Sequence, residues 1–359
     1  MSGNGLEAAA LMLLAGEGSP LQAARATGFG DAASFRRAFA RRYGTAPEAF
    51  AGLPRSGGYR FTFNAPFHLG KTLQTLGRDP DSLAERLAGN RYTRFFPLGG
   101  GIGGGSVLAG GPVRVTLALD ENGCEVRVRR GLHPARYLEL HGLIRRVLGL
   151  DQPLAAFYRV ARGDRVFGPL VKKFPGVRIP VLPSLWEALC WAVVGQQINL
   201  AFAYRLRNRL IRLGNPNSRH SLLPFPTPEQ VGRLTPAQLR QNQFSRQKSE
   251  YLRGLARAFL NGPLSGLTSH TPVEEAEATM LAVKGLGRWS AAYGLMRGLG
   301  HPDALPVGDA GLRTALKIQF GLAEPPSISE QERLMEPFRP FRSLATYYLW
   351  RSLDLLPSD

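Results

Sequence analysis

The 359-residue sequence has little of what builds disulfide scaffolds or metal centres. Cys124 and Cys190 are its only two cysteines, which excludes a disulfide framework, a four-cysteine zinc site and an iron–sulfur cluster. Sparing use of cysteine is typical of a reducing compartment, so we expect a cytoplasmic protein. The six histidines form no H-x-x-H or H-x-x-x-H pair. We therefore expect no catalytic metal and no other cofactor.

Long hydrophobic runs are also absent. The most apolar stretch, residues 185–200, is interrupted by Glu187, Gln196 and Gln197. No run reaches the roughly 18 apolar residues that a membrane span requires. The N-terminus lacks the basic and then apolar order of a secretory signal. We expect a protein that neither enters a membrane nor is exported.

Acidic residues are scarce compared with basic ones. The chain has 27 Asp and Glu against 45 Lys and Arg, which gives a formal net charge of +18. A protein this basic is attracted to polyanions such as nucleic acid. The hydrophobic content of 44% and the charged content of 20% are those of globular proteins, and the length suffices for two or three domains. We expect a folded, monomeric protein that binds nucleic acid.

The N-terminal 55 residues predict short helices with a basic face. Ser19 and Asp31 are expected helix caps, and a small residue followed four positions later by Gly28 is the spacing of a helix-turn-helix. The last expected helix carries four arginines that could contact DNA: Arg36, Arg37, Arg41 and Arg42. The alternative is a bundle whose arginines face solvent. Residues 55–65 contain Gly and Ser and predict a linker, so we expect residues 1–55 to form a separate segment.

The remaining chain divides into an α+β part and a helical part. Residues 56–133 alternate like strands at 59–63, 92–96, 113–119 and 125–129, with a helix expected over 66–87. A G-x-G-x-x-G match at 99–104 precedes a strand-like segment instead of a helix, so we reject dinucleotide binding. From residue 134 onward the periodicity is helical, including one long helix expected over 186–213. We expect one lobe from residues 134–180 completed by 310–359, and a second lobe from 181–309.

A short glycine turn between two of these helices predicts a contact with DNA backbone. Gly285 and Gly287 bracket a leucine that can pack between the helices, which leaves backbone N–H groups exposed for a phosphate. Lys284 and Arg288 flank the turn and are candidate backbone contacts. An ordinary connection between helices is the alternative.

An aspartate follows in the segment Pro-Val-Gly-Asp, residues 306–309, just before another helix. Asp309 could be a plain helix cap, a position that aspartate favours. Hairpin, loop and aspartate together resemble the helix-hairpin-helix DNA glycosylase superfamily. Four segments, in order, resemble its 3-methyladenine DNA glycosylase II members: VVGQQINLAFA (193–203), FPTPEQV (225–231), VKGLGRWSAAY (283–293) and FRSLATYYLW (341–350). Residues 19–50 resemble a helix-turn-helix of AraC-family regulators.

The glycosylase resemblance implies a mainly α fold with an α+β subdomain, in which two helical lobes flank a cleft. It implies a base excision repair enzyme that removes alkylated bases from double-stranded DNA, with Asp309 as the catalytic carboxylate. Trp289, Tyr293 and Trp350 match pocket aromatics of the family, and Gln197 with Gln196 matches the wedge that fills the gap left by a flipped base.

Trp289 also occupies the position at which strand-cutting relatives carry a lysine nucleophile, which implies a monofunctional hydrolase. Two alternatives remain open at this stage. One is a non-catalytic DNA-binding regulator on the same scaffold, and the other is a bifunctional glycosylase for oxidised bases.

Overall fold

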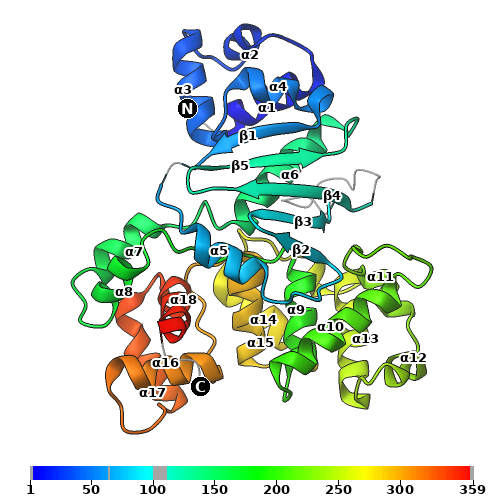
Figure 1. The fold of residues 1–359 in the computed structure, drawn as a ribbon, viewed down its shortest axis with the longest axis vertical. Coiled ribbons are helices and arrows are strands. Elements are labelled where there is room, and N and C mark those ends of the chain that lie inside the picture. Colours follow the sequence, from blue (N-terminus) through cyan, green and yellow to red (C-terminus); the bar gives the residue numbers. More distant parts are fainter. Residues whose placement is uncertain (1–2, 64, 100–110, 356–359) are drawn as a thin grey trace. The chain divides into compact units, whose positions relative to one another are not determined.

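The computed structural model describes residues 3–63, 65–99 and 111–355 (Figure 1). Most of the glycine-rich segment from 99 to 104 therefore lies outside the described residues. The chain divides into two compact units. Residues 1–80 and 84–145 form the first unit, and residues 81–83 and 146–359 form the second.

The first unit is built on an antiparallel five-stranded sheet with the order β1-β5-β4-β3-β2. The strands are β1 (Gly58–Thr62), β2 (Glu85–Ala88), β3 (Arg91–Phe96), β4 (Val113–Leu119) and β5 (Gly123–Val128). Burial alternates along β3 and β4, as expected when one face of a sheet is covered. Helix α6 (Pro134–Val147) packs on that sheet, where the His141 ring contacts Tyr59 and Phe61 of β1.

The helix expected over residues 66–87 is wrong in its second half. Helix α5 (Leu69–Leu76) ends at Gly77, and residues 85–88 instead form the edge strand β2. This strand is held by antiparallel pairing with β3, in which Glu85 lies opposite Arg94. Pairing with a later strand decides its conformation, and local periodicity does not contain that information.

Four helices precede the sheet: α1 (Gly3–Ala15), α2 (Pro20–Ala26), α3 (Ala32–Tyr43) and α4 (Pro47–Ser56). The capping expectations are confirmed, because the Ser19 and Asp31 side chains accept hydrogen bonds from backbone N–H groups of α2 and α3. Gly28 turns the chain with a φ of +81°. Figure 1 shows these helices next to β1, with α4 running directly into that strand.

The expected linker is wrong, because residues 54–62 are the end of α4 and the whole of β1. Phe50 of α4 is fully buried, with its ring 5.8 Å from Tyr59 and 5.5 Å from His141. Backbone hydrogen bonds also join the segments, since Gly44 accepts from the N–H of Thr62 at 2.7 Å. The N-terminal helices and the sheet therefore share one core and fold as one unit.

The regular secondary structure in the described part of the second unit is helical. Its longer helices are α7 (Leu154–Ala161), α9 (Leu185–Gly195), α10 (Leu200–Gly214), α13 (Arg246–Leu260), α14 (Val273–Leu281), α16 (Ala310–Phe320), α17 (Ile328–Met335) and α18 (Arg342–Ser352). Its shorter ones are α8 (Phe167–Lys173), α11 (Pro228–Arg233), α12 (Pro236–Gln241) and α15 (Arg288–Tyr293). No helix in the described part of the chain is long and apolar enough to cross a membrane.

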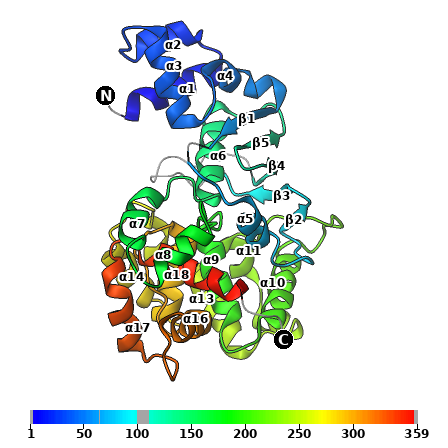
Figure 2. The ribbon, with the colours of Figure 1, turned by 60° about the vertical axis from the view of Figure 1, so that its left-hand side comes forward.

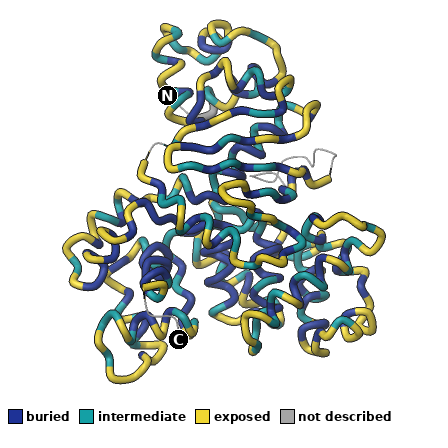
Figure 3. The backbone as a smooth tube through the Cα atoms, in the orientation of Figure 1, coloured by how far each residue is buried: buried dark blue, intermediate teal, exposed yellow. Residues whose placement is uncertain are grey.

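One continuous hydrophobic core connects these helices, from Phe157 of α7 to Leu349 of α18. Figures 1 and 2 both show α8 beside α18, and these two helices are in contact. Residues 134–145 of α6, which we expected in the same lobe as the C-terminal helices, are part of the first unit. Figure 3 shows buried backbone along the inner helices and exposed backbone in the outer loops. The predicted fold class, mainly helical with a small sheet, is confirmed.

The long helix expected over residues 186–213 is two helices. Helix α9 ends at Gly195, and Asn199 caps α10 by accepting a hydrogen bond from the N–H of Phe202 at 2.9 Å. Residues 196–199 form the turn between them, called here the 196–199 turn. Gln196 and Gln197, two of the polar residues that interrupt the apolar pattern, thus mark a break between helices, whereas Glu187 lies within α9.

Candidate active site

Asp309 lies at the N-terminus of α16, where its carboxylate accepts hydrogen bonds from three N–H donors. One oxygen, Oδ1, accepts from the backbone of Leu312 at 2.8 Å and from the Trp350 indole at 2.9 Å. The other, Oδ2, accepts from the Trp289 indole at 3.0 Å. The helix cap is therefore real, but it uses only part of the carboxylate. The two indole N–H groups fix its orientation.

The loop in front of Asp309 is held from two sides. Gly308 has a φ of +80°, and its N–H donates to the buried side chain of Gln331 at 2.9 Å. Behind it, Gly311 allows a close approach, because a Cβ there would lie 3.2 Å from Asp309 Oδ1 and 3.3 Å from Trp350. The positive φ thus favours glycine at position 308, and a side chain at position 311 would press on the carboxylate and the indole.

The three aromatics predicted for the base pocket gather around this carboxylate. Trp289 stacks on Tyr293 with ring centroids 5.3 Å apart and planes inclined by 27°. Tyr293 is buried against Ala188 and Ala192 of α9, whereas Trp289 and Trp350 are half-buried. Tyr293 therefore supports the stack, while the two tryptophans remain partly accessible beside Asp309.

The glycine hairpin joins α14 to α15 as the sequence indicated. Leu286 is only 6% exposed and packs in the core, while Gly285 has a φ of +98°. A Cβ on Gly285 would lie 2.3 Å from the Tyr251 ring of α13, so the ring leaves no room for a side chain. Helix α15 begins after Gly287 without a side-chain cap. Backbone N–H groups at this end are thus not covered by a capping side chain.

The two basic residues beside the hairpin differ in their contacts within the protein. Lys284 is exposed. Arg288 forms an exposed ion pair with Glu332 of α17 at 2.5 Å. A phosphate that contacts Arg288 must therefore compete with that carboxylate.

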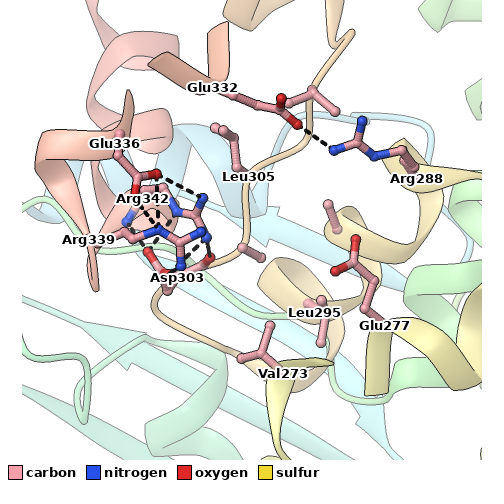
Figure 4. A pocket seen from close by; sticks show the side chains of 13 residues that line it. Val273, Glu277, Arg288, Leu295, Asp303, Leu305, Glu332, Glu336, Arg339 and Arg342 are labelled. Carbon is pink, nitrogen blue, oxygen red and sulfur yellow. Dashed lines mark hydrogen bonds and ion pairs between the residues drawn. The ribbon is translucent and has the colours of Figure 1, made fainter. Parts of the chain in front are cut away.

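A cavity of about 340 Å³ lies beside the Arg288 ion pair (Figure 4). On its opposite side Asp303 binds Arg339 and Arg342, at 3.2 Å and 2.9 Å. Neither Asp309 nor the aromatic residues around it line this cavity. Its ionic lining braces the loop at 303–307, which leads to Asp309, and lacks the aromatic walls that would hold a base.

The 196–199 turn separates the two glutamines predicted as a wedge. Gln197 is exposed and adopts a left-handed backbone conformation with a φ of 55°. Gln196 turns toward the hairpin, where its amide donates to the carbonyl of Gly285 at 2.9 Å. Of the two glutamines, Gln197 is therefore the one whose side chain is exposed.

Sequence reasoning missed Lys248 of α13. Its ammonium group donates to three backbone carbonyls at the end of α9 and in the 196–199 turn. A buried lysine near the start of an amphipathic helix carries no local signal of such a role. The partner carbonyls lie more than 50 positions away in the sequence.

The four arginines of α3 belong to the first unit. Arg36 pairs with Glu48 at 2.6 Å, and Arg37 donates to the Ser34 hydroxyl at 3.0 Å. The Arg42 guanidinium lies 5.8 Å from the centre of the Tyr43 ring. Part of this basic face is thus engaged within the unit, and its contact with DNA stays a prediction that includes Arg41.

A helix-hairpin-helix followed by a glycine loop and a helix-capping aspartate defines a class of DNA repair proteins, and comparison with known families agrees. Residues 190–340 match the HhH-GPD superfamily of base excision DNA repair proteins, and residues 59–184 match the AlkA N-terminal domain. DNA-3-methyladenine glycosylase of Bacillus subtilis is 38% identical over 208 residues, 57% of this chain and 69% of that protein. The chain belongs to this helix-hairpin-helix base excision repair superfamily, as the sequence predicted.

Two further similarities extend this result. A Mycobacterium tuberculosis protein named "Probable bifunctional transcriptional activator/DNA repair enzyme AlkA" is 34% identical over 218 residues, 58% of this chain and 42% of that protein. The structure of a 3-methyladenine DNA glycosylase from Archaeoglobus fulgidus superposes with a TM-score of 0.68 and 22% identity, covering 82% of this chain and 97% of that one. This structural similarity supports the fold.

Proposed function

We propose that this protein is a monofunctional DNA glycosylase that hydrolyses the N-glycosidic bond of alkylated bases in double-stranded DNA. The observation that carries the proposal is the Asp309 carboxylate, held by the indoles of Trp289 and Trp350 beside the hairpin. The relatives named as 3-methyladenine glycosylases support the choice of lesion. We expect the protein to act as a monomer in the cytoplasm, where it meets chromosomal DNA.

Asp309 would act on the sugar of a nucleotide that has left the base stack. Breaking the C1′–N bond places positive charge on the sugar, which the carboxylate stabilises electrostatically. The same carboxylate orients the attacking water and accepts its proton. Its two indole donors keep it in place during this step.

The half-buried indoles would select the base. An alkylated purine that carries a positive charge is attracted to an electron-rich ring by about 0.5–2 kcal/mol. Trp289 offers such a ring with Tyr293 stacked behind it. This modest preference suffices, because alkylation already makes the base a good leaving group.

Trp289 also supports hydrolysis without strand cleavage. It stands at the start of α15 just after the hairpin, where a strand-cutting enzyme needs an amine to form a Schiff base. The lysine of the hairpin, Lys284, precedes both glycines and is exposed, which suits a contact with a phosphate. The hairpin N–H groups and the net charge of +18 would then hold the DNA backbone.

Incubation with alkylated duplex DNA, followed by chromatography of the released bases, tests the proposal. We expect free alkylated purines and an intact abasic strand. Tight binding of DNA without any base release would instead support a non-catalytic DNA-binding protein.

A further inference from the structure

The 196–199 turn has a conformation that needs support. Gln197 holds a φ of 55° although it is not glycine, and its side chain is exposed. Left-handed backbone is strained for a residue of this kind and persists where surrounding contacts determine it. Those contacts come from α13.

Lys248 supplies them through all three of its N–H donors. Its Nζ donates to the carbonyls of Val193 at 3.2 Å, Val194 at 2.9 Å and Gln196 at 2.6 Å. The last carbonyls of a helix lack partners within the helix, and a positive charge is favoured at that end. Lys248 is 8% exposed, so its ammonium group serves these carbonyls and faces little water. It therefore caps α9 and fixes the carbonyl that immediately precedes Gln197.

The same helix also fixes the hairpin. Tyr251, three residues after Lys248, lies against Gly285 so closely that a Cβ there would be 2.3 Å from the ring. The Gln196 side chain completes the connection, because its amide donates to the Gly285 carbonyl at 2.9 Å. Lys248, the 196–199 turn and the hairpin thus form a closed set of contacts.

We propose that Lys248 is a positioning residue for opening the duplex, which holds the 196–199 turn so that Gln197 fills the space of the departing nucleotide. This inference rests on the proposed function. A turn that is ordered before DNA binds loses no conformational freedom when the base leaves the stack. Because the turn is fixed to the hairpin, the distance between Gln197 and the phosphates bound at the hairpin is also set. The contribution of Lys248 is therefore confined to substrates whose base must be displaced from a stable pair.

The test compares one alkylated purine opposite its complementary base and opposite a mismatched base, in otherwise identical duplexes. Displacing a mismatched base costs less free energy. Lys248→Met removes the three donors and keeps an unbranched side chain that is one atom shorter. We expect single-turnover excision from the paired duplex to fall about tenfold, the size typical of losing charge-assisted hydrogen bonds. Excision from the mismatched duplex should fall about twofold or less, so the ratio of the two rates changes.

Leu252→Ala provides a matched control on the same helix. Leu252 is fully buried in the core, and none of the hydrogen bonds of the turn involves it. We expect this variant to lower the melting temperature at least as much as Lys248→Met while the ratio of paired to mismatched excision stays that of the wild type. Lys248→Arg, which keeps a charged donor, should restore part of the ratio.

The outcomes separate the inference from the proposed function. An active wild type and a Lys248→Met variant with an unchanged ratio overturn the inference alone. A ratio that changes equally in Leu252→Ala also overturns it, because loss of stability then explains the effect. A wild type that releases no base from either duplex overturns both.

Discussion

Replacing Asp309 by asparagine separates its two roles. The variant keeps an oxygen that can accept from the backbone N–H of Leu312, so the cap of α16 survives. Its amide nitrogen cannot accept a hydrogen bond, so one of the two indole donors, that of Trp289 or that of Trp350, loses its acceptor. Leaving a half-buried donor without a partner costs about 1 kcal/mol, which lowers the melting temperature of a unit of this size by about 2–4 °C.

The effect on the rate should be much larger. A carboxylate about 4 Å from a developing unit positive charge stabilises it by about 4 kcal/mol at an effective dielectric constant of about 20. Because about 1.4 kcal/mol corresponds to a factor of ten, Asp309→Asn should slow base excision about 10³-fold. The affinity for duplex DNA should stay nearly unchanged, because the substitution does not alter the residues of the hairpin that would contact the DNA backbone.

Single-turnover excision, measured by alkali cleavage of the abasic product, gives this rate directly. Asp31→Asn is the matched control, because Asp31 caps α3 through an equivalent hydrogen bond to the N–H of Ser34 at 2.8 Å. We expect the control to excise at the wild-type rate. If the excision rate of Asp309→Asn fell less than about tenfold, Asp309 would have a structural role only.

Three further predictions follow from the geometry. Borohydride should trap no covalent protein–DNA adduct during turnover, since Trp289 offers no amine; a trapped adduct on that timescale would establish a lyase. Burial, helped by the charges of Arg145 and Arg42, lowers the pKa of His141 from 6.5 to about 3. Below pH 6.5 the unfolded chain therefore binds a proton at this histidine and the folded chain does not. The free energy of unfolding should fall by about 1 kcal/mol between pH 6 and 5, and this fall should be smaller in His141→Phe. Deleting residues 1–56 should give insoluble protein, because it exposes the sheet surface under Phe50; a soluble product with a wild-type melting temperature would refute this packing.

Local signals in the sequence predicted the parts of the site that local structure decides. Gly285 and Gly287 around a buried leucine indicate a hairpin, because a tight turn leaves a local signal in its own residues. Asp309 before a helical segment indicates a cap for the same reason. What the sequence could not provide is the pair of indole hydrogen bonds, since Trp350 lies 41 positions from Asp309 and reaches it only when α18 packs beside α16.

The error over the linker has a similar physical cause. Proline and glycine at residues 54–58 are ambiguous, because the same residues that separate domains also end helices. Here Gly57 ends α4 with a φ of +69°, and a Cβ there would lie 2.7 Å from the carbonyl of Val128 in β5. The deciding information lies in Phe50, whose burial depends on an α6 histidine some 90 positions later. The segment that resembles a helix-turn-helix is thus part of the core of the first unit, and its arginines would contact DNA as part of that unit.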